Sequence, residues 1–124
     1  MGKSSLEQGE YALGSYKVRY ADWSNGEWFG VGPWLKVIVT NRRLLLFVDA
    51  GTQRDAARRI EPEQIKQVWN LCLGRRDGVM VKLKDGCRLY MLVDWSQGNK
   101  LVKDINEMLT PPLKPRIAPR LQPS

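Results

Sequence analysis

The chain has 124 residues and a formal net charge of +7, from 20 basic and 13 acidic side chains, and it contains no histidine. This length predicts one domain, and the composition, 43% hydrophobic and 27% charged, is that of a globular protein. The lack of histidine excludes histidine general bases, serine–histidine and cysteine–histidine nucleophile pairs and most transition-metal sites. The apolar runs are too short to span a bilayer and the polar start has no signal-peptide pattern, so we expect a cytoplasmic protein.

The N-terminal part predicts a polar segment, a strand and a loop. Residues 1–9 are polar, and we expect them to be mobile. The first strand is clearest over residues 16–20, where two tyrosines and a valine alternate with two bases. Residues 22–33 contain three glycines and a proline, which predicts a loop rather than a regular element.

A hairpin is the clearest structural signal of the chain. Its strands are predicted over residues 34–40 and 44–48, with a tight reversal at Asn41–Arg42. The second strand is apolar at every position and is expected to be buried on both faces. A short strand over residues 58–60 is expected to follow.

The next segments predict two further strands and a second hairpin. Residues 65–73 are rich in β-forming side chains, and residues 79–84 alternate apolar and polar side chains. Asp85–Gly86 predicts a two-residue turn with positive φ at both positions. The return strand then places alternate side chains on one face: Cys87, Leu89, Met91 and Val93.

One amphipathic helix closes the predicted domain. Leu101, Ile105 and Met108 share one face, and Ser96 or Asp94 is the expected N-cap. The helix is expected to stop before the prolines, and residues 110–124 form a Pro-rich basic tail. The order is therefore about seven strands in meander fashion and then one helix, which covers the open end of a bent sheet.

Two stretches of this sequence resemble a known family. Val39–Phe47 resembles the central hairpin of the GRAM and bacterial pleckstrin-homology-like (PH-like) domains, and Ile60–Val68 is similar to the segment that follows it there. The resemblance covers residues 9–109 and implies a domain over 10–109. The implied fold is mainly β, a partly open barrel of about seven antiparallel strands capped by one C-terminal α-helix.

The resemblance also implies a class of function. Domains of this kind bind lipid headgroups or proteins and do not catalyse reactions, so we expect no enzymatic activity and no cofactor. A small oligonucleotide-binding barrel remains an alternative fold, although its helix lies between strands rather than at the end.

Three bases are candidates for contact with an anionic headgroup. Related phosphoinositide-binding domains carry bases on the first two strands, and Lys17, Arg19 and Lys36 occupy similar places here. The loop between these strands carries Asp22 and Glu27, which repel an anion. The alternative is that the three bases are solvated positions on the outer face of the sheet.

Four aromatic residues in the predicted loop form a second candidate contact: Trp23, Trp28, Phe29 and Trp34. The pair Trp28–Phe29 is expected at the tip. Exposed aromatic side chains insert into a membrane interface or form the centre of a protein interface. Alternatively, the loop folds back and buries them, or it mediates self-association.

Paired arginines at turns and loop edges form a third candidate: Arg42, Arg43, Arg58, Arg59, Arg75 and Arg76. If these turns share one end of the barrel, they form a basic rim that engages phosphates. The alternative is that they are solvated and neutralised by nearby acids.

Cys72 and Cys87 lack metal-ligand spacing, so no metal site is expected and buried free thiols are the default interpretation.

Taken together, these features predict a non-catalytic binding module whose partner is a protein or an anionic membrane surface. Contact is expected through the aromatic loop 23–34 and the nearby bases. The alternatives are a nucleic-acid-binding barrel and a homo-oligomeric structural domain.

Overall fold

The structure is a computed structural model and describes residues 7–48 and 57–110. The expectations for residues 1–6 and for the tail beyond Thr110 lie outside these described residues. The elements follow in chain order: β1 (Ala12–Ser24), β2 (Glu27–Gly30), β3 (Leu35–Thr40), β4 (Leu44–Val48), β5 (Arg58–Ile60), the 3₁₀ turn η1 (Pro62–Gln64), β6 (Ile65–Leu73), β7 (Arg76–Leu83), β8 (Arg88–Val93), the 3₁₀ turn η2 (Asp94–Ser96) and α1 (Gly98–Leu109).

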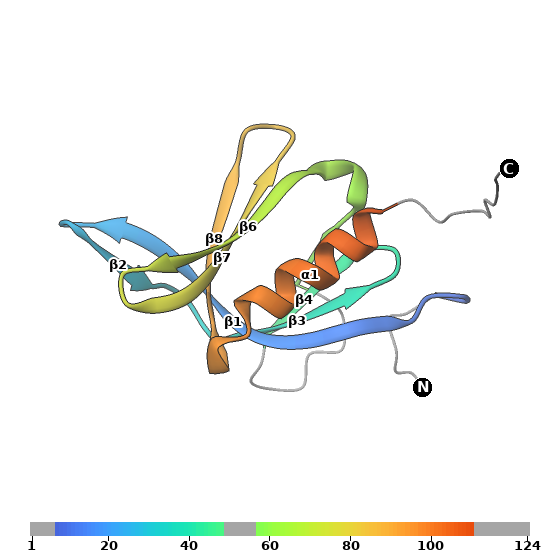
Figure 1. Cartoon of the computed structure of the whole chain (residues 1–124), viewed down its shortest axis with the longest axis horizontal. Coiled ribbons are helices and arrows are strands. Elements are labelled where there is room, and N and C mark those ends of the chain that lie inside the picture. Colours follow the sequence, from blue (N-terminus) through green and yellow to red (C-terminus); the bar gives the residue numbers. More distant parts are fainter. Residues whose placement is uncertain (1–6, 49–56, 111–124) are drawn as a thin grey trace, which may run out of the picture.

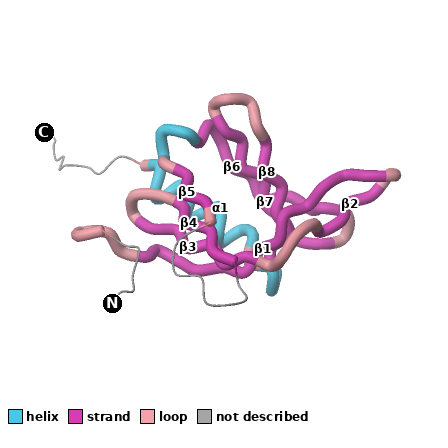
Figure 2. Tube along the Cα trace, turned by 180° about the vertical axis from the view of Figure 1, so that it is seen from behind, coloured by secondary structure: helices cyan, strands magenta, loops and turns pink. Residues whose placement is uncertain are grey.

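The strands form one bent antiparallel sheet. Their order is β5-β4-β3-β1-β8-β7-β6, and β2 pairs with the far end of β1. Because β1 is long, it pairs with β3 over Ala12–Val18 and with β8 over Val18–Tyr20, and so joins the two halves of the sheet. Helix α1 lies across one face of this sheet (Figures 1 and 2).

The core lies between the sheet and α1. Alternate side chains of every long strand point toward the helix, and Val18, Val79 and Val81 are fully buried there. Leu101 and Ile105 meet them from the predicted face of α1. We call this the inner face of the sheet, and the face away from α1 the outer face.

The prediction of an irregular loop over residues 22–33 is wrong for part of that range. Strand β1 continues to Ser24, and β2 returns as a hairpin that pairs Trp23 with Trp28. The turn between them is Asn25–Gly26, with φ of 52° and 82°. Two left-handed residues in a two-residue loop match the right-handed twist of the flanking strands, which is why Asn-Gly suits this position.

The predicted type of the turn at Asp85–Gly86 is also wrong. Of the residues at the β7–β8 turn, Gly86 has positive φ (97°), whereas Asp85 does not. The Leu83 amide donates to the Cys87 carbonyl at 2.8 Å, and the Gly86 amide donates to the Leu83 carbonyl at 3.0 Å. These bonds close a three-residue loop, in which only the last residue needs the left-handed conformation.

The helix cap comes from a distant strand, so the expected local caps are wrong. Asp94 and Ser96 lie in η2, and the N-cap position, Gln97, makes no side-chain capping bond. Instead, the Gly98 amide donates to Oδ2 of Asp77 in β7 at 2.5 Å. A carboxylate at this position satisfies a free amide and offsets the positive end of the helix dipole.

A tyrosine on β1 fastens the helix to the sheet. The Tyr16 hydroxyl donates to the Asp104 carboxylate of α1, close to Gly14. Burial and then the hydrogen bond to Asp104 raise the pKa of Tyr16 above its usual value. The two cysteines differ from expectation, because Cys72 and Cys87 are both exposed rather than buried.

Candidate functional site

The three predicted bases share the outer face of the sheet but are held in different ways. Lys17 and Lys36 lie directly opposite each other in the β1–β3 ladder, and both are exposed. The Lys17 ammonium lies 5.5 Å from the centre of the Trp34 ring. Arg19 donates through Nε to the Gly32 carbonyl at 2.8 Å, so it is anchored to the segment before β3.

Most of the predicted aromatic loop is a two-stranded β-ribbon with side chains on both faces. Trp28 is half-buried, because its ring packs edge-on against Trp23 (5.4 Å) and tilted against Tyr90 (4.8 Å). Trp23 is 55% exposed and Phe29 is 43% exposed, on opposite faces of the ribbon. The tip is Asn25–Gly26, so the predicted tip at Trp28–Phe29 is wrong.

A depression of about 240 Å³ brings together residues that are distant in the sequence. Trp34 lines it together with Arg75 of the β6–β7 turn and Arg76 at the start of β7. Trp95 of η2 completes the lining and is 83% exposed. The site thus combines one predicted aromatic residue with two predicted arginines.

Two carboxylates also line this depression, but each has a structural role. Asp77 accepts the Gly98 amide and an Asn70 side-chain bond at 2.9 Å. Asp94 accepts the Trp95 backbone amide at 3.1 Å. The two aspartates are half-buried and the two arginines are exposed, so the arginines present the more accessible charge.

Trp95 is held in an unusual backbone conformation. Its φ is 60° and that of Ser96 is 53°, two consecutive left-handed residues without a glycine. This conformation costs about 1–2 kcal/mol per residue in an L-amino acid. Strain of this kind at an exposed aromatic residue points to a binding role. Trp95 was not predicted as a contact residue, because its isolated position after a strand carries no pattern that identifies it.

The predicted arginine rim is not one continuous surface. Arg43 is buried and pairs with the buried Glu10, its Nε 3.0 Å from Oε2. Arg42 at the same turn pairs with Glu7 at 3.6 Å. Figure 1 shows this β3–β4 turn at the opposite end of the molecule from the β6–β7 turn, which carries Arg75 and Arg76. Arg58 and Arg59 are exposed on β5, at one edge of the sheet.

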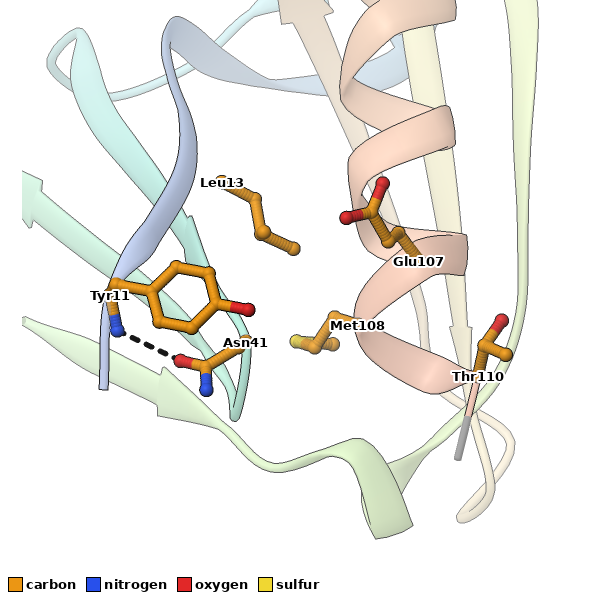
Figure 3. A pocket seen from close by; sticks show the side chains of 6 residues that line it. All are labelled: Tyr11, Leu13, Asn41, Glu107, Met108 and Thr110. Carbon is orange, nitrogen blue, oxygen red and sulfur yellow. Dashed lines mark hydrogen bonds between the residues drawn. The ribbon is translucent and has the colours of Figure 1, made fainter. Parts of the chain in front are cut away.

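A second depression, of about 250 Å³, lies at the far end of α1. Figure 3 shows Tyr11 and Leu13 facing Glu107 and Met108 across it, with the Tyr11 amide bonded to Asn41. Its lining contains one carboxylate and no base, so it does not suit an anionic ligand.

The described residues contain neither a cluster of metal ligands nor a helix that could span a membrane. Within residues 7–48 and 57–110, no group of three or more histidine, cysteine or acidic side chains is placed to hold a metal ion. In the same ranges, no helix is long and apolar enough to cross a bilayer.

Comparison with solved structures defines the fold class. The chain is similar to the C-terminal PH domain of human pleckstrin 2, with a TM-score of 0.63 and 10% identity over 90% of this chain and 93% of that one. It is also similar to the C-terminal domain of an unknown protein from Leishmania infantum, with a TM-score of 0.59 and 13% identity over 83% and 88% of the two chains. No family model matches the sequence, and no curated protein sequence matches it.

The chain therefore has a PH-like fold, a mainly antiparallel β structure with one C-terminal helix, and the predicted fold class is confirmed. The narrower resemblance to the GRAM and bacterial PH-like families stays a prediction. At these low identities the similarity concerns the fold alone.

Proposed function

We propose that this protein is a non-catalytic binding module that docks peripherally on anionic membrane surfaces. The observation that carries the proposal is the depression in which Arg75 and Arg76 lie beside Trp34 and the exposed Trp95. Lys17 and Lys36 extend the positive charge from Trp34 along the outer face. The β1–β2 hairpin lies at the same end of the molecule as the β6–β7 turn (Figure 1).

The energetics favour a combination of charge and aromatic insertion. A base near an anionic bilayer contributes about 1 kcal/mol, so four bases give an apparent Kd of only about 1 mM. Indole rings add affinity because the ring enters the interface while its N–H stays hydrated. Trp95 and Trp23 are the exposed rings placed to do this.

The acids of the hairpin determine which side faces the lipid. Asp22 and Glu27 lie on the Phe29 face of the ribbon, opposite to Trp23 and Trp28. An anionic surface repels that face, so the Trp23 face is the one we expect to approach the membrane.

The depression itself suits a shallow contact. At about 240 Å³ it is smaller than typical small-molecule pockets, which span about 300–1,000 Å³. A lipid phosphate that meets Arg75 and Arg76 at its rim fits this size better than a deeply buried ligand. A guanidinium pair is suited to this contact because it donates several hydrogen bonds to phosphate oxygens.

Sedimentation with vesicles tests the proposal. The wild-type chain is expected to pellet with phosphatidylserine-containing vesicles and not with pure phosphatidylcholine vesicles. The double variant Arg75→Ser–Arg76→Ser should bind roughly 30-fold more weakly, the loss of two bases at about 1 kcal/mol each. The matched control Lys66→Ser–Lys84→Ser removes the same charge at the other end of β6 and β7 and should bind nearly as the wild type.

Two outcomes contradict the proposal. If neither kind of vesicle pellets the chain, a protein partner becomes the better hypothesis for this surface. If both double variants lose affinity equally, net charge rather than the depression drives binding. A blue shift of tryptophan fluorescence on vesicles, reduced by Trp95→Ser, would support aromatic insertion.

A further inference from the structure

The outer face of the sheet carries a row of large side chains that crosses adjacent strands. Trp69 of β6 pairs with Met80 of β7, which pairs with Tyr90 of β8. The Tyr90 ring packs against Trp28, 4.8 Å away, and so continues the row onto the β1–β2 hairpin. We call these four side chains the aromatic row.

The aromatic row is separate from the hydrophobic core. The neighbouring residues Val68, Val81 and Met91 point into the core beneath α1, so the row lies on the opposite face. Met80 is buried but does not belong to the core cluster. Trp69, at the open edge of the row, is 38% exposed.

Two bases lie beside the row on the same face, and neither has an acidic side chain as a partner among the described residues. Lys82 and Arg88 lie directly opposite each other, one step along the same face. Neither forms an ion pair with the residues that the structure describes. Like charges directly opposite each other destabilise a sheet, and an anion between them would relieve the repulsion.

The strands around the row carry no acid on this face. The sequences of β6 and β8 contain no aspartate or glutamate. The single acid of β7, Asp77, is bonded to the start of α1, and the acids of the hairpin lie on its other face. The face therefore presents flat apolar rings beside unopposed positive charge.

We propose that the aromatic row and its two bases bind single-stranded nucleic acid. Unpaired bases would stack on the exposed Trp69 and the half-buried Tyr90, while phosphates would pair with Lys82 and Arg88. Sheet faces with aromatic rings and flanking bases bind single strands because every nucleobase has a flat face. The side chains proposed to contact the strand, Trp69, Tyr90, Lys82 and Arg88, do not line the membrane depression. Lys82 lies about 20 Å along β7 from Arg76.

The shape of the row favours this ligand over a bilayer. Met80 is 8% exposed and lies low between its neighbours, so the row does not protrude in the way that membrane insertion requires. A duplex is also a poor ligand, because its bases are stacked on one another and unavailable to Trp69.

Fluorescence anisotropy with the full chain tests this inference. The probes are labelled oligothymidylate and oligouridylate of about 12 nucleotides, and a duplex of equal length. We expect the single strands to bind more tightly than the duplex. Trp69→Ala should weaken single-strand binding about tenfold, within the range for loss of one stacked base. The control Trp95→Ala removes an exposed ring outside the row and should have little effect.

A charge variant provides a second readout that does not depend on the ring. Lys82→Ser–Arg88→Ser should make the slope of log K against log salt concentration shallower by about 1.4, the value for two lost phosphate contacts on a single strand. Lys100→Ser–Lys103→Ser removes the same charge from exposed positions on α1, behind the sheet, and should leave the slope nearly unchanged.

Several results would overturn the inference. Absence of binding, equal affinity for duplex and single strand, or unchanged affinity in Trp69→Ala would each do so. Equal competition by polyglutamate would show that an acidic polypeptide suits this face as well as a nucleic acid does. Vesicle binding by the wild type leaves the inference unaffected, because Arg75→Ser–Arg76→Ser separates the two sites.

Discussion

Among the described residues, Glu10 is the buried acidic side chain, and the side chains of two neighbours stabilise its charge. Arg43 donates from Nε and Nη2 to its two carboxylate oxygens at 3.0 and 3.1 Å. The Thr40 hydroxyl donates to Oε2 at 2.5 Å. Burial by itself raises the pKa of Glu10, but the bonds from Arg43 and Thr40 outweigh it and hold the pKa below its usual value.

This network predicts a pH dependence of stability. Because the folded pKa of Glu10 is lowered, its contribution is present above the unfolded pKa and is lost as the pH falls through the folded value. Glu10→Gln should cost about 3 kcal/mol at pH 7, since it leaves Arg43 without its charged partner. Urea denaturation at pH 7 and at acidic pH measures the free energy of unfolding of the wild type and of Glu10→Gln.

The difference between wild type and Glu10→Gln should shrink as the pH falls below the usual glutamate pKa of about 4.3 and through the lower pKa of Glu10 in the folded state. An equal difference at both pH values would mean that the carboxylate charge contributes nothing. Glu7→Gln is the matched control, because it makes the same substitution in the exposed ion pair with Arg42 and should cost little at either pH.

At the scale of elements, helix α1 depends on a carboxylate from another part of the chain. Asp77→Ala removes the acceptor of the Gly98 amide and should destabilise the fold by about 1 kcal/mol, the usual cost of a lost cap. Faster amide exchange in the first turn of α1 would locate the effect. Asp94→Ala is the control, because Asp94 bonds only within η2 among the described residues. If Asp94→Ala costs as much, the cap is assigned to the wrong residue.

These elements show what the sequence predicts and what it does not. The strand pair 34–40 and 44–48 was predictable because apolar periodicity reports burial directly. The β1–β2 hairpin carried a usable signal in Asn25–Gly26, but the glycines and the proline around it outweighed that signal. The cap by Asp77 had no signal in the sequence, because local sequence contains no information about which strand lies beside a helix end.

The same distinction applies to the candidate site. Basic and aromatic residues were predictable as exposed groups, and Lys17, Lys36 and Trp34 do share one face. The buried position of Arg43 was not predictable, because its partner Glu10 lies on a different segment. The depression required the whole fold, since it joins Trp34 to two turns that follow it in the chain by about forty and sixty residues.

At the scale of the whole molecule, the bases of the two proposed surfaces lie at opposite ends of β7. Arg76 begins β7 and Arg75 precedes it, whereas Lys82 lies near the end of the strand. The helix covers the inner face and supplies no group to either surface. The fold therefore acts as a rigid support, and binding at each surface is expected to change with local substitutions rather than with global stability.

The strained turn η2 allows this separation of binding from stability to be tested. Glycine adopts a φ of 60° without the steric cost that Trp95 bears, so Trp95→Gly should stabilise the fold by about 1 kcal/mol or leave it unchanged once lost packing is included. The same variant should bind anionic vesicles more weakly, because the exposed indole is gone.

Ser96→Gly is the control: it relieves similar strain, at a φ of 53°, and should stabilise the fold while binding vesicles as the wild type does. Thermal denaturation and vesicle sedimentation on both variants measure the two effects. If Trp95→Gly binds vesicles as tightly as Ser96→Gly, the strain at Trp95 has no role in membrane binding, and the proposed contact must rest on the bases alone.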